Sequence, residues 1–185
     1  MKYNVPLRVV SSFTEGPGTL IVKETNDMED VLISGIAKKD NEVRVNIAGI
    51  PDKPGVASSI FKQLADASIN VNMIVQSVGK EGHSQISFTV MNTDLDEAKK
   101  VMAKLQTELG AESVTYDADI AIVSVVGVGM KVYSGVAAAV FDELAKNSIN
   151  IEMISTSEIK ISVVIRKADA EKTVQALHRR FFMQA

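Results

Sequence analysis

The chain has 185 residues, of which 46% are hydrophobic, a net charge of -3 and no cysteine. This length fits one or two domains with buried cores, and the lack of a basic stripe argues against nucleic-acid binding, which needs clustered cations. Without cysteine the chain has no disulfide and no thiolate metal site, as fits a cytoplasmic protein, and its longest uncharged run, Ala67 to Gly79, is too short to span a membrane.

The first forty residues give weak signals. Val5 to Phe13 predicts an edge strand, because Pro6 cannot donate to a sheet ladder. Lys23 to Asp30 is polar and typical of a linker. Val31 to Ala37 predicts a strand that ends in a turn over Lys38 to Asn41.

From Glu42 the pattern becomes regular. Apolar residues alternate in Glu42–Ile50 and in Ser84–Met91, and they recur at helical spacing in two other segments. Asp94 and Glu97 are typical of a capping box at the start of the second helix, and Gly110 ends that helix. The predicted elements are strand Glu42–Ile50, helix Val56–Ala67, strand Val71–Val78, strand Ser84–Met91, a helix ending at Leu109 and strand Glu112–Tyr116. Their order, β-α-β-β-α-β, is ferredoxin-like.

The helix and its flanking turns recur once, always 80 positions later and without a gap. Repeats of this kind indicate tandem structural units. The matched pairs are Gly55 and Gly135, Val56 and Val136, Ala57 and Ala137, Phe61 and Phe141, Asn70 and Asn150, and Met73 and Met153.

The second unit lacks a final strand. Its predicted elements are strand Ile120–Val126, helix Gly135–Asn147, strands Ile151–Thr156 and Ile159–Ile165, and helix Asp169–Phe182. Because an open sheet edge invites aggregation, we expect Val31–Ala37 to pair there, with Val5–Val10 as the weaker alternative. The predicted fold class is α+β: two βαββαβ modules with antiparallel sheets, the first inserted within the second.

The turn before the first helix is the best candidate for a binding site. Backbone N–H groups from Gly55 to Ser58 are unpaired at a helix start and carry the positive end of the helix dipole, so a carboxylate would fit there. Asp52 would contact an ammonium or hydroxyl group, and the amides of Asn70 and Asn72 would reach the ligand of a neighbouring module. The plainer interpretation is that Asp52 is a turn residue and that Asn70 takes the left-handed conformation at the helix exit.

Other motifs favour no chemistry. His83 and His178 have no ligand cluster around them, and Gly127-Val128-Gly129 is too short for a dinucleotide fingerprint. We therefore expect no metal and no cofactor.

Two tandem units with Asp52-Lys53-Pro54-Gly55 at the first helix resemble ACT domains, small modules that bind amino acids and regulate enzymes. The segment Tyr3 to Ile21 resembles the end of the catalytic domain of bacterial aspartate kinases. The motifs Asn150-Ile151 and Ile154 to Ile159 resemble the second ACT repeat of those enzymes.

This resemblance implies a regulatory chain without catalysis of its own. Residues 1–27 would be the kinase-domain end and linker, 42–117 the first ACT domain, and 31–39 with 119–185 the second. Two copies would pair through their sheets, a catalytic aspartate kinase subunit or domain would be the other partner, and threonine or lysine would bind at the interfaces. Two origins fit the sequence equally: Met1 is an internal translation start, or the chain is an excised regulatory fragment.

The resemblance also implies a set of effector-binding residues. In the first repeat they are Asp52, Lys53, Pro54, Gly55, Val56, Ala57, Asn70, Val71, Asn72 and Gln76. In the second they are Met130, Gly135, Val136, Ala137, Asn150, Ile151 and Ser157. The second repeat carries Val132 in place of Asp52 and Glu152 in place of Asn72. We therefore expect it to contribute surfaces to a shared site.

Three other functions fit these residues less well. A free-standing tandem ACT regulator would have no use for the kinase-like opening. An acylphosphatase-type hydrolase needs an arginine in the loop at Asp52 to Gly55, which has none. An RNA-recognition module needs stacking aromatics on its central strands, and Ser84–Met91 offers only Phe88.

Overall fold

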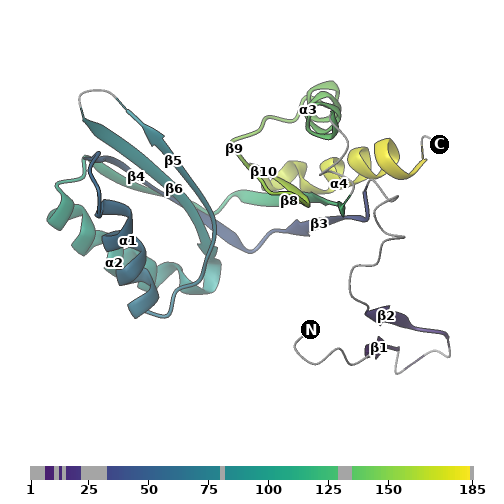
Figure 1. The fold of residues 1–185 in the computed structure, drawn as a ribbon, viewed down its shortest axis with the longest axis horizontal. Coiled ribbons are helices and arrows are strands. Elements are labelled where there is room, and N and C mark those ends of the chain that lie inside the picture. Colours follow the sequence, from purple (N-terminus) through teal and green to yellow (C-terminus); the bar gives the residue numbers. More distant parts are fainter. Residues whose placement is uncertain are drawn as a thin grey trace.

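The computed structural model describes residues 7–10, 13, 16–21, 33–79, 82–128 and 135–183, which form two adjoining modules and a small hairpin apart from both (Figure 1). The strands are β1 (Leu7–Val9), β2 (Thr19–Ile21), β3 (Gly35–Lys39), β4 (Glu42–Pro51), β5 (Val71–Val78), β6 (His83–Met91), β7 (Ser113–Asp117), β8 (Ile120–Val126), β9 (Met153–Thr156) and β10 (Lys160–Arg166). The helices are α1 (Val56–Asp66), α2 (Leu95–Leu109), α3 (Val136–Lys146) and α4 (Ala170–His178). No helix in these described ranges is long and apolar enough to cross a bilayer.

The first module is an antiparallel sheet in the order β5-β6-β4-β7, with α1 and α2 on one face (Figure 1). Alternation in β4 buries Val43, Val45 and Ile47 completely beneath these helices. Ile60 and Leu64, one turn apart on α1, complete this core and are also fully buried. The predicted β-α-β-β-α-β order is confirmed.

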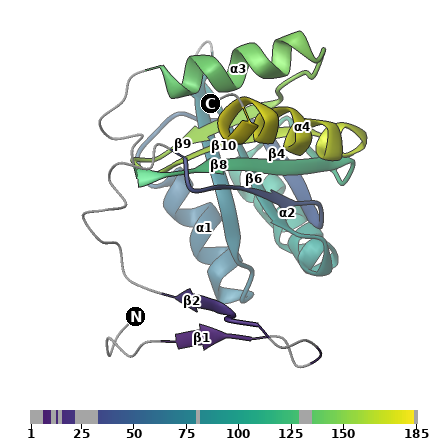
Figure 2. The same cartoon turned by 90° about the vertical axis from the view of Figure 1, so that its right-hand side faces the viewer.

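The second module repeats this arrangement, with strands in the order β9-β10-β8-β3 and with α3 and α4 on one face (Figure 2). β3 pairs antiparallel with β8, Ala37 lying opposite Ser124, and so takes the place that β7 has in the first sheet. The first module is therefore inserted within the second, as predicted. The alternative donor is not used, because β1 pairs with β2 instead.

Two local predictions are wrong, one at the end of a strand and one at the start of a helix. Lys38 and Lys39 belong to β3 rather than to a turn, while Val31, where that strand was expected to begin, lies outside the described residues. The capping box does not form: the side chain of Asp94 makes no cap hydrogen bond to α2, and Glu97 pairs with Lys100. A short 3-10 turn, Asn92–Asp94, leads into α2 in its place.

The helix exits also differ from expectation. The left-handed residue after α1 is Ser68, with φ of 59°, rather than Asn70, and Ser148 repeats this after α3 with φ of 55°. The last helix is shorter than predicted, because after α4 the chain continues as a π-helical turn, Arg179–Met183. Within that turn Phe181 packs on the second core.

The modules meet through an apolar cluster. Met73 of β5 packs against side chains of the second sheet that point away from α3 and α4. The buried members are Met73, Ile120, Ile122, Met153 and Val164, with Val75 packed against them. Burial of these side chains holds the two sheets together within one chain.

Four charged residues close an inter-module ion ring beside this cluster. Arg44 of β4 lies 2.9 Å from Asp117 and 2.5 Å from Glu152. Arg166 of β10 lies 2.8 Å from Asp117 and 2.6 Å from Glu152. Each arginine thus contacts an acid of its own module and one of the other, so the ring fixes how the modules are placed.

Candidate functional site

The start of α1 offers backbone donors that no side chain caps. Gly55 is the N-cap residue, with φ of 96°, and it makes no side-chain cap hydrogen bond; the first turn of the helix carries no acidic residue. A glycine adopts this φ without strain, which lets the chain turn sharply into the helix. The expectation that all N–H groups from Gly55 to Ser58 are unpaired is wrong for Val56, whose N–H donates to the carbonyl of Lys53 at 3.4 Å. No side chain covers the positive end of the helix dipole, so it can face an external anion.

A pocket of about 380 Å³ lies at this helix start. It is lined by Pro51, Asp52, Lys53, Pro54, Gly55, Val56, Ala57, Gln76 and Ser84. The turn is held in place because the Asp52 N–H donates to the carbonyl of Gly82 at 2.8 Å. The pocket thus brings together helix N–H groups, one carboxylate and one amide, which can bind both ends of an amino acid.

The structure brings together most of the first-repeat residues but separates three of them. Asn70 and Val71 lie at the opposite end of α1, where Val71 packs against the first core. Asn72 donates to Glu42 at 3.0 Å and lines a different cavity, between the modules. Within one chain these three do not line the pocket at Asp52.

The second repeat has the same helix start. Gly135 is the N-cap of α3 with φ of 100°, again without a side-chain cap or an acid in the first turn. Asn150 and Ile151 lie at the far end of α3, and Ile151 packs against the second core. Ser157 forms the turn after β9, where its N–H donates to the carbonyl of Lys160 at 2.7 Å. Met130 and Val132 lie outside the described residues.

Sequence reasoning missed two residues that line the pocket. Ser84, at 3% exposure, lies opposite Ile50 of β4 and Val78 of β5, because β6 pairs with both strands. Pro51 is the last residue of β4, opposite His83. The strands Glu42–Ile50 and Ser84–Met91 were both predicted, and following their pairing to its end would have found both residues.

Comparison with known proteins agrees with this arrangement. The family model described as "ACT domain" matches residues 45–106 and 123–181. An aspartate kinase from Pseudomonas fluorescens is 50% identical over 185 residues, all of this chain and 45% of its own length. An aspartokinase from Helicobacter pylori is 46% identical over 181 residues, 44% of its length. The solved regulatory subunit of aspartate kinase from Thermus thermophilus has a TM-score of 0.77 and 37% identity, with 81% of this chain and 99% of that chain covered.

The chain therefore belongs to the ACT domain family. Within that family it corresponds to the regulatory ACT part of aspartate kinases: it spans less than half the length of the whole enzymes it matches but nearly all of a regulatory subunit.

Proposed function

We propose that this chain is the amino-acid sensor of an aspartate kinase and that threonine or lysine binds in the pocket at the start of α1, for feedback inhibition of aspartate-family amino-acid biosynthesis. One observation carries the proposal: Asp52, Gln76 and the uncapped helix start line the same pocket. The family supports it, because the matched relatives are aspartate kinases.

The chemistry of the pocket suits a free amino acid. The ligand carboxylate accepts hydrogen bonds from the N–H groups of the first turn, at the positive end of the helix dipole. The ligand ammonium pairs with the Asp52 carboxylate, and the amide of Gln76 contacts the side chain. Such a ligand shifts the kinase only by its difference in affinity between two arrangements of the modules, typically about 1–3 kcal/mol.

A second copy of the chain completes the site in this proposal. β5 is the edge strand of the first sheet, and it exposes 50% of Ile74 and 73% of Val78. β9 is the matching edge of the second sheet, and its Ile154 is 43% exposed. Edge strands with large exposed apolar residues favour pairing between copies. Such pairing would bring Asn70 or Asn150 of one copy towards the pocket of the other.

The catalytic subunit or domain of the kinase is the second proposed partner, and the cytoplasm is the proposed location. The N-terminal hairpin, β1 with β2, extends away from both modules (Figure 1) and exposes 54% of Val9. We place the contact with the catalytic part on this side of the molecule.

Calorimetric titration of the chain with threonine and with lysine, alone and together, tests the proposal, with dimerisation followed in the same samples. Saturable binding coupled to tighter association is expected. Absence of binding by either ligand at millimolar concentration would contradict the effector assignment for this chain.

Two variants test the pocket itself. We expect Asp52→Ala to remove the ammonium contact and Gly55→Asp to repel the ligand carboxylate, each weakening binding at least tenfold while the fold remains. Asp96→Ala is the control for the first, because Asp96 is 95% exposed on α2. Gly110→Asp is the control for the second, because Gly110 also has positive φ and open space around it. Unchanged affinity in either pocket variant would remove that residue from the site.

A further inference from the structure

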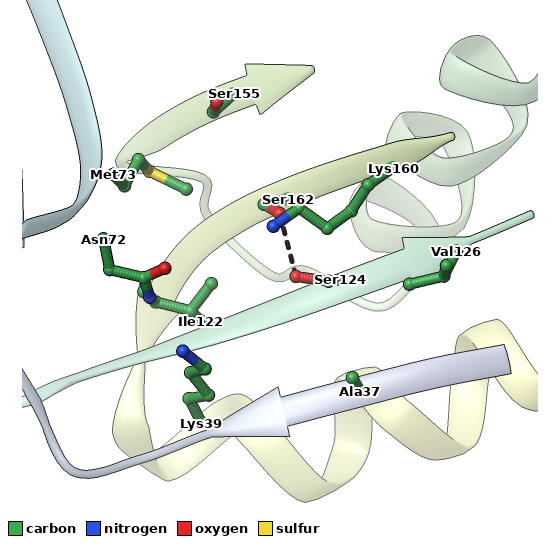
Figure 3. Close-up of a pocket in the computed structure, with 10 residues that line it drawn as sticks. All are labelled: Ala37, Lys39, Asn72, Met73, Ile122, Ser124, Val126, Ser155, Lys160 and Ser162. Carbon is green, nitrogen blue, oxygen red and sulfur yellow. Dashed lines mark hydrogen bonds between the residues drawn. The ribbon is translucent and has the colours of Figure 1, made fainter. Parts of the chain in front are cut away.

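A second cavity, of about 140 Å³, lies between the modules on the face of the second sheet that α3 and α4 leave open (Figure 3). β5 of the first module contributes Asn72 and Met73, and β3, β8, β9 and β10 contribute the rest. None of the residues at the start of α1 lines it. The volume is several times what one water molecule needs.

The floor of this cavity is a row of small side chains. Strand pairing places Ala37 opposite Ser124, Ser124 opposite Ser162 and Ser162 opposite Ser155. The hydroxyls of Ser124 and Ser162 lie 2.8 Å apart, at 9% and 3% exposure. One of the two donates to the other, so the pair retains a second O–H donor that this contact does not use.

Two lysines flank the floor. Lys39 of β3 and Lys160 of β10 lie on either side of β8, and their side chains extend towards the serine pair and Asn72 (Figure 3). Lys39 is 3.7 Å from the buried carboxylate of Glu42, which also accepts from Asn72. No described acid forms an ion pair with Lys160. Two cations thus face one carboxylate, which leaves the cavity positive.

A comparable cavity of about 310 Å³ lies against the first sheet, and it lacks the positive charge of the cavity on the second sheet. It is lined by Val75, Ser77, Gln85, Ser87, Ile151, Glu152, Met153 and Ile154, none of them a cation. One of its two serines is already engaged, since Ser87 donates to the amide oxygen of Asn46 at 2.8 Å. Glu152, 80 positions after Asn72, is held in the inter-module ion ring. Of these two cavities between the modules, the one on the second sheet therefore combines a free hydroxyl donor with a positive charge.

We infer that the cavity at Ser124 and Ser162 binds a small oxyanion, a carboxylate or a phosphate group, at a site separate from the proposed effector pocket. The anion accepts hydrogen bonds from the ammonium of Lys160 and from the spare hydroxyl of the serine pair. Charge-assisted hydrogen bonds of this kind are stronger than neutral ones. Because Asn72 and Met73 form one wall, the bound anion contacts both modules and stabilises the arrangement seen here.

Isothermal titration of the full chain with succinate and with inorganic phosphate, at ionic strength held constant with chloride, tests this site. Saturable binding of at least one probe is expected, and the probe that binds identifies the group that fits. We expect Lys160→Gln to weaken this binding about tenfold, the value of one charge-assisted contact. Ser162→Ala is expected to weaken it severalfold. Lys62→Gln, the same charge change on α1, is expected to leave it unchanged.

Lys53→Gln separates this site from the pocket at the start of α1, which also contains a lysine. Binding of succinate or phosphate that is lost in Lys53→Gln but retained in Lys160→Gln would overturn the inference. Equal losses in Lys160→Gln and Lys62→Gln, or no saturable binding of either probe, would overturn it as well. If threonine and lysine fail to bind, only the proposed effector pocket is contradicted. The outcome of the succinate and phosphate titrations does not depend on it.

Discussion

Gly49 and Gly55 both adopt positive φ, but their surroundings differ. Gly49, with φ of 69°, lies in the irregular part of β4 between Ala48 and Ile50. An added Cβ there would lie 2.2 Å to 2.7 Å from side-chain atoms of Glu112. At Gly55, with φ of 96°, the same atom would meet nothing within 4 Å. Of these two glycines, Gly49 therefore combines backbone strain with a steric clash and Gly55 does not.

We expect Gly49→Ala to lower the free energy of unfolding by about 2–4 kcal/mol, because left-handed strain and overpacking add. Gly55→Ala carries the strain alone and should lower it by about 1–2 kcal/mol. Urea titration of each variant measures the difference. Gly35→Ala is the control, since Gly35 has neither positive φ nor a close neighbour. Equal losses at Gly49 and Gly55 would contradict the steric argument.

Among the elements, β3 has a role that its neighbours in sequence do not share. It covers the edge of β8, whose residues from Ile120 to Val125 are buried. We expect deletion of residues 1–40 to expose that edge and cause aggregation, whereas deletion of residues 1–32 leaves β3 in place and the chain monodisperse. Light scattering with size-exclusion chromatography distinguishes the two. Equal behaviour of both deletions would show that the edge needs no cover.

Sequence patterns predicted β5 and β8 to the residue and α1 to within one residue, because runs of apolar residues between turns and helical spacing are local in sequence. β3 was misplaced because Lys38 and Lys39 read as turn residues. Ion pairs to other elements support their strand conformation: Lys38 pairs with Glu171 of α4, and Lys39 pairs with Glu42 of β4. Such contacts leave no periodic signal.

The same limit applies to the candidate site. The residues at the start of α1 were predicted together because turn chemistry and helix capping are local in sequence. Asn72 was grouped with them from its place in the motif, yet it lies in the cavity between the modules. Where Asn72 points depends on how the two sheets pack against one another, which no segment of sequence specifies alone.

For the whole molecule, the inter-module ion ring links the placement of the modules to pH. Burial raises the pKa of Asp117, but the hydrogen bond from the Asp119 N–H and the nearby Arg166 and Arg44 lower it more, so the net shift is downward. An acid whose pKa is lower in the folded state stabilises the fold above its unfolded-state pKa, about 3.9. That stabilisation is lost as the pH falls through the lower, folded-state value.

The Asp117→Asn variant should therefore be less stable than the unmodified chain at pH 7. As the pH falls below about 4, it should lose less further stability than the unmodified chain does. It also leaves Arg44 and Arg166 with Glu152 as their one remaining acid in the ring, so we expect the modules to be held less firmly. Urea unfolding across this pH range measures the first effect, and small-angle X-ray scattering at pH 7 measures the second. Asp96→Asn is the control, because Asp96 is 95% exposed and lies 3.9 Å from Lys99. Parallel pH profiles for both variants would mean that the ring does not couple the modules to acid, and the apolar cluster around Met73 would then hold them alone.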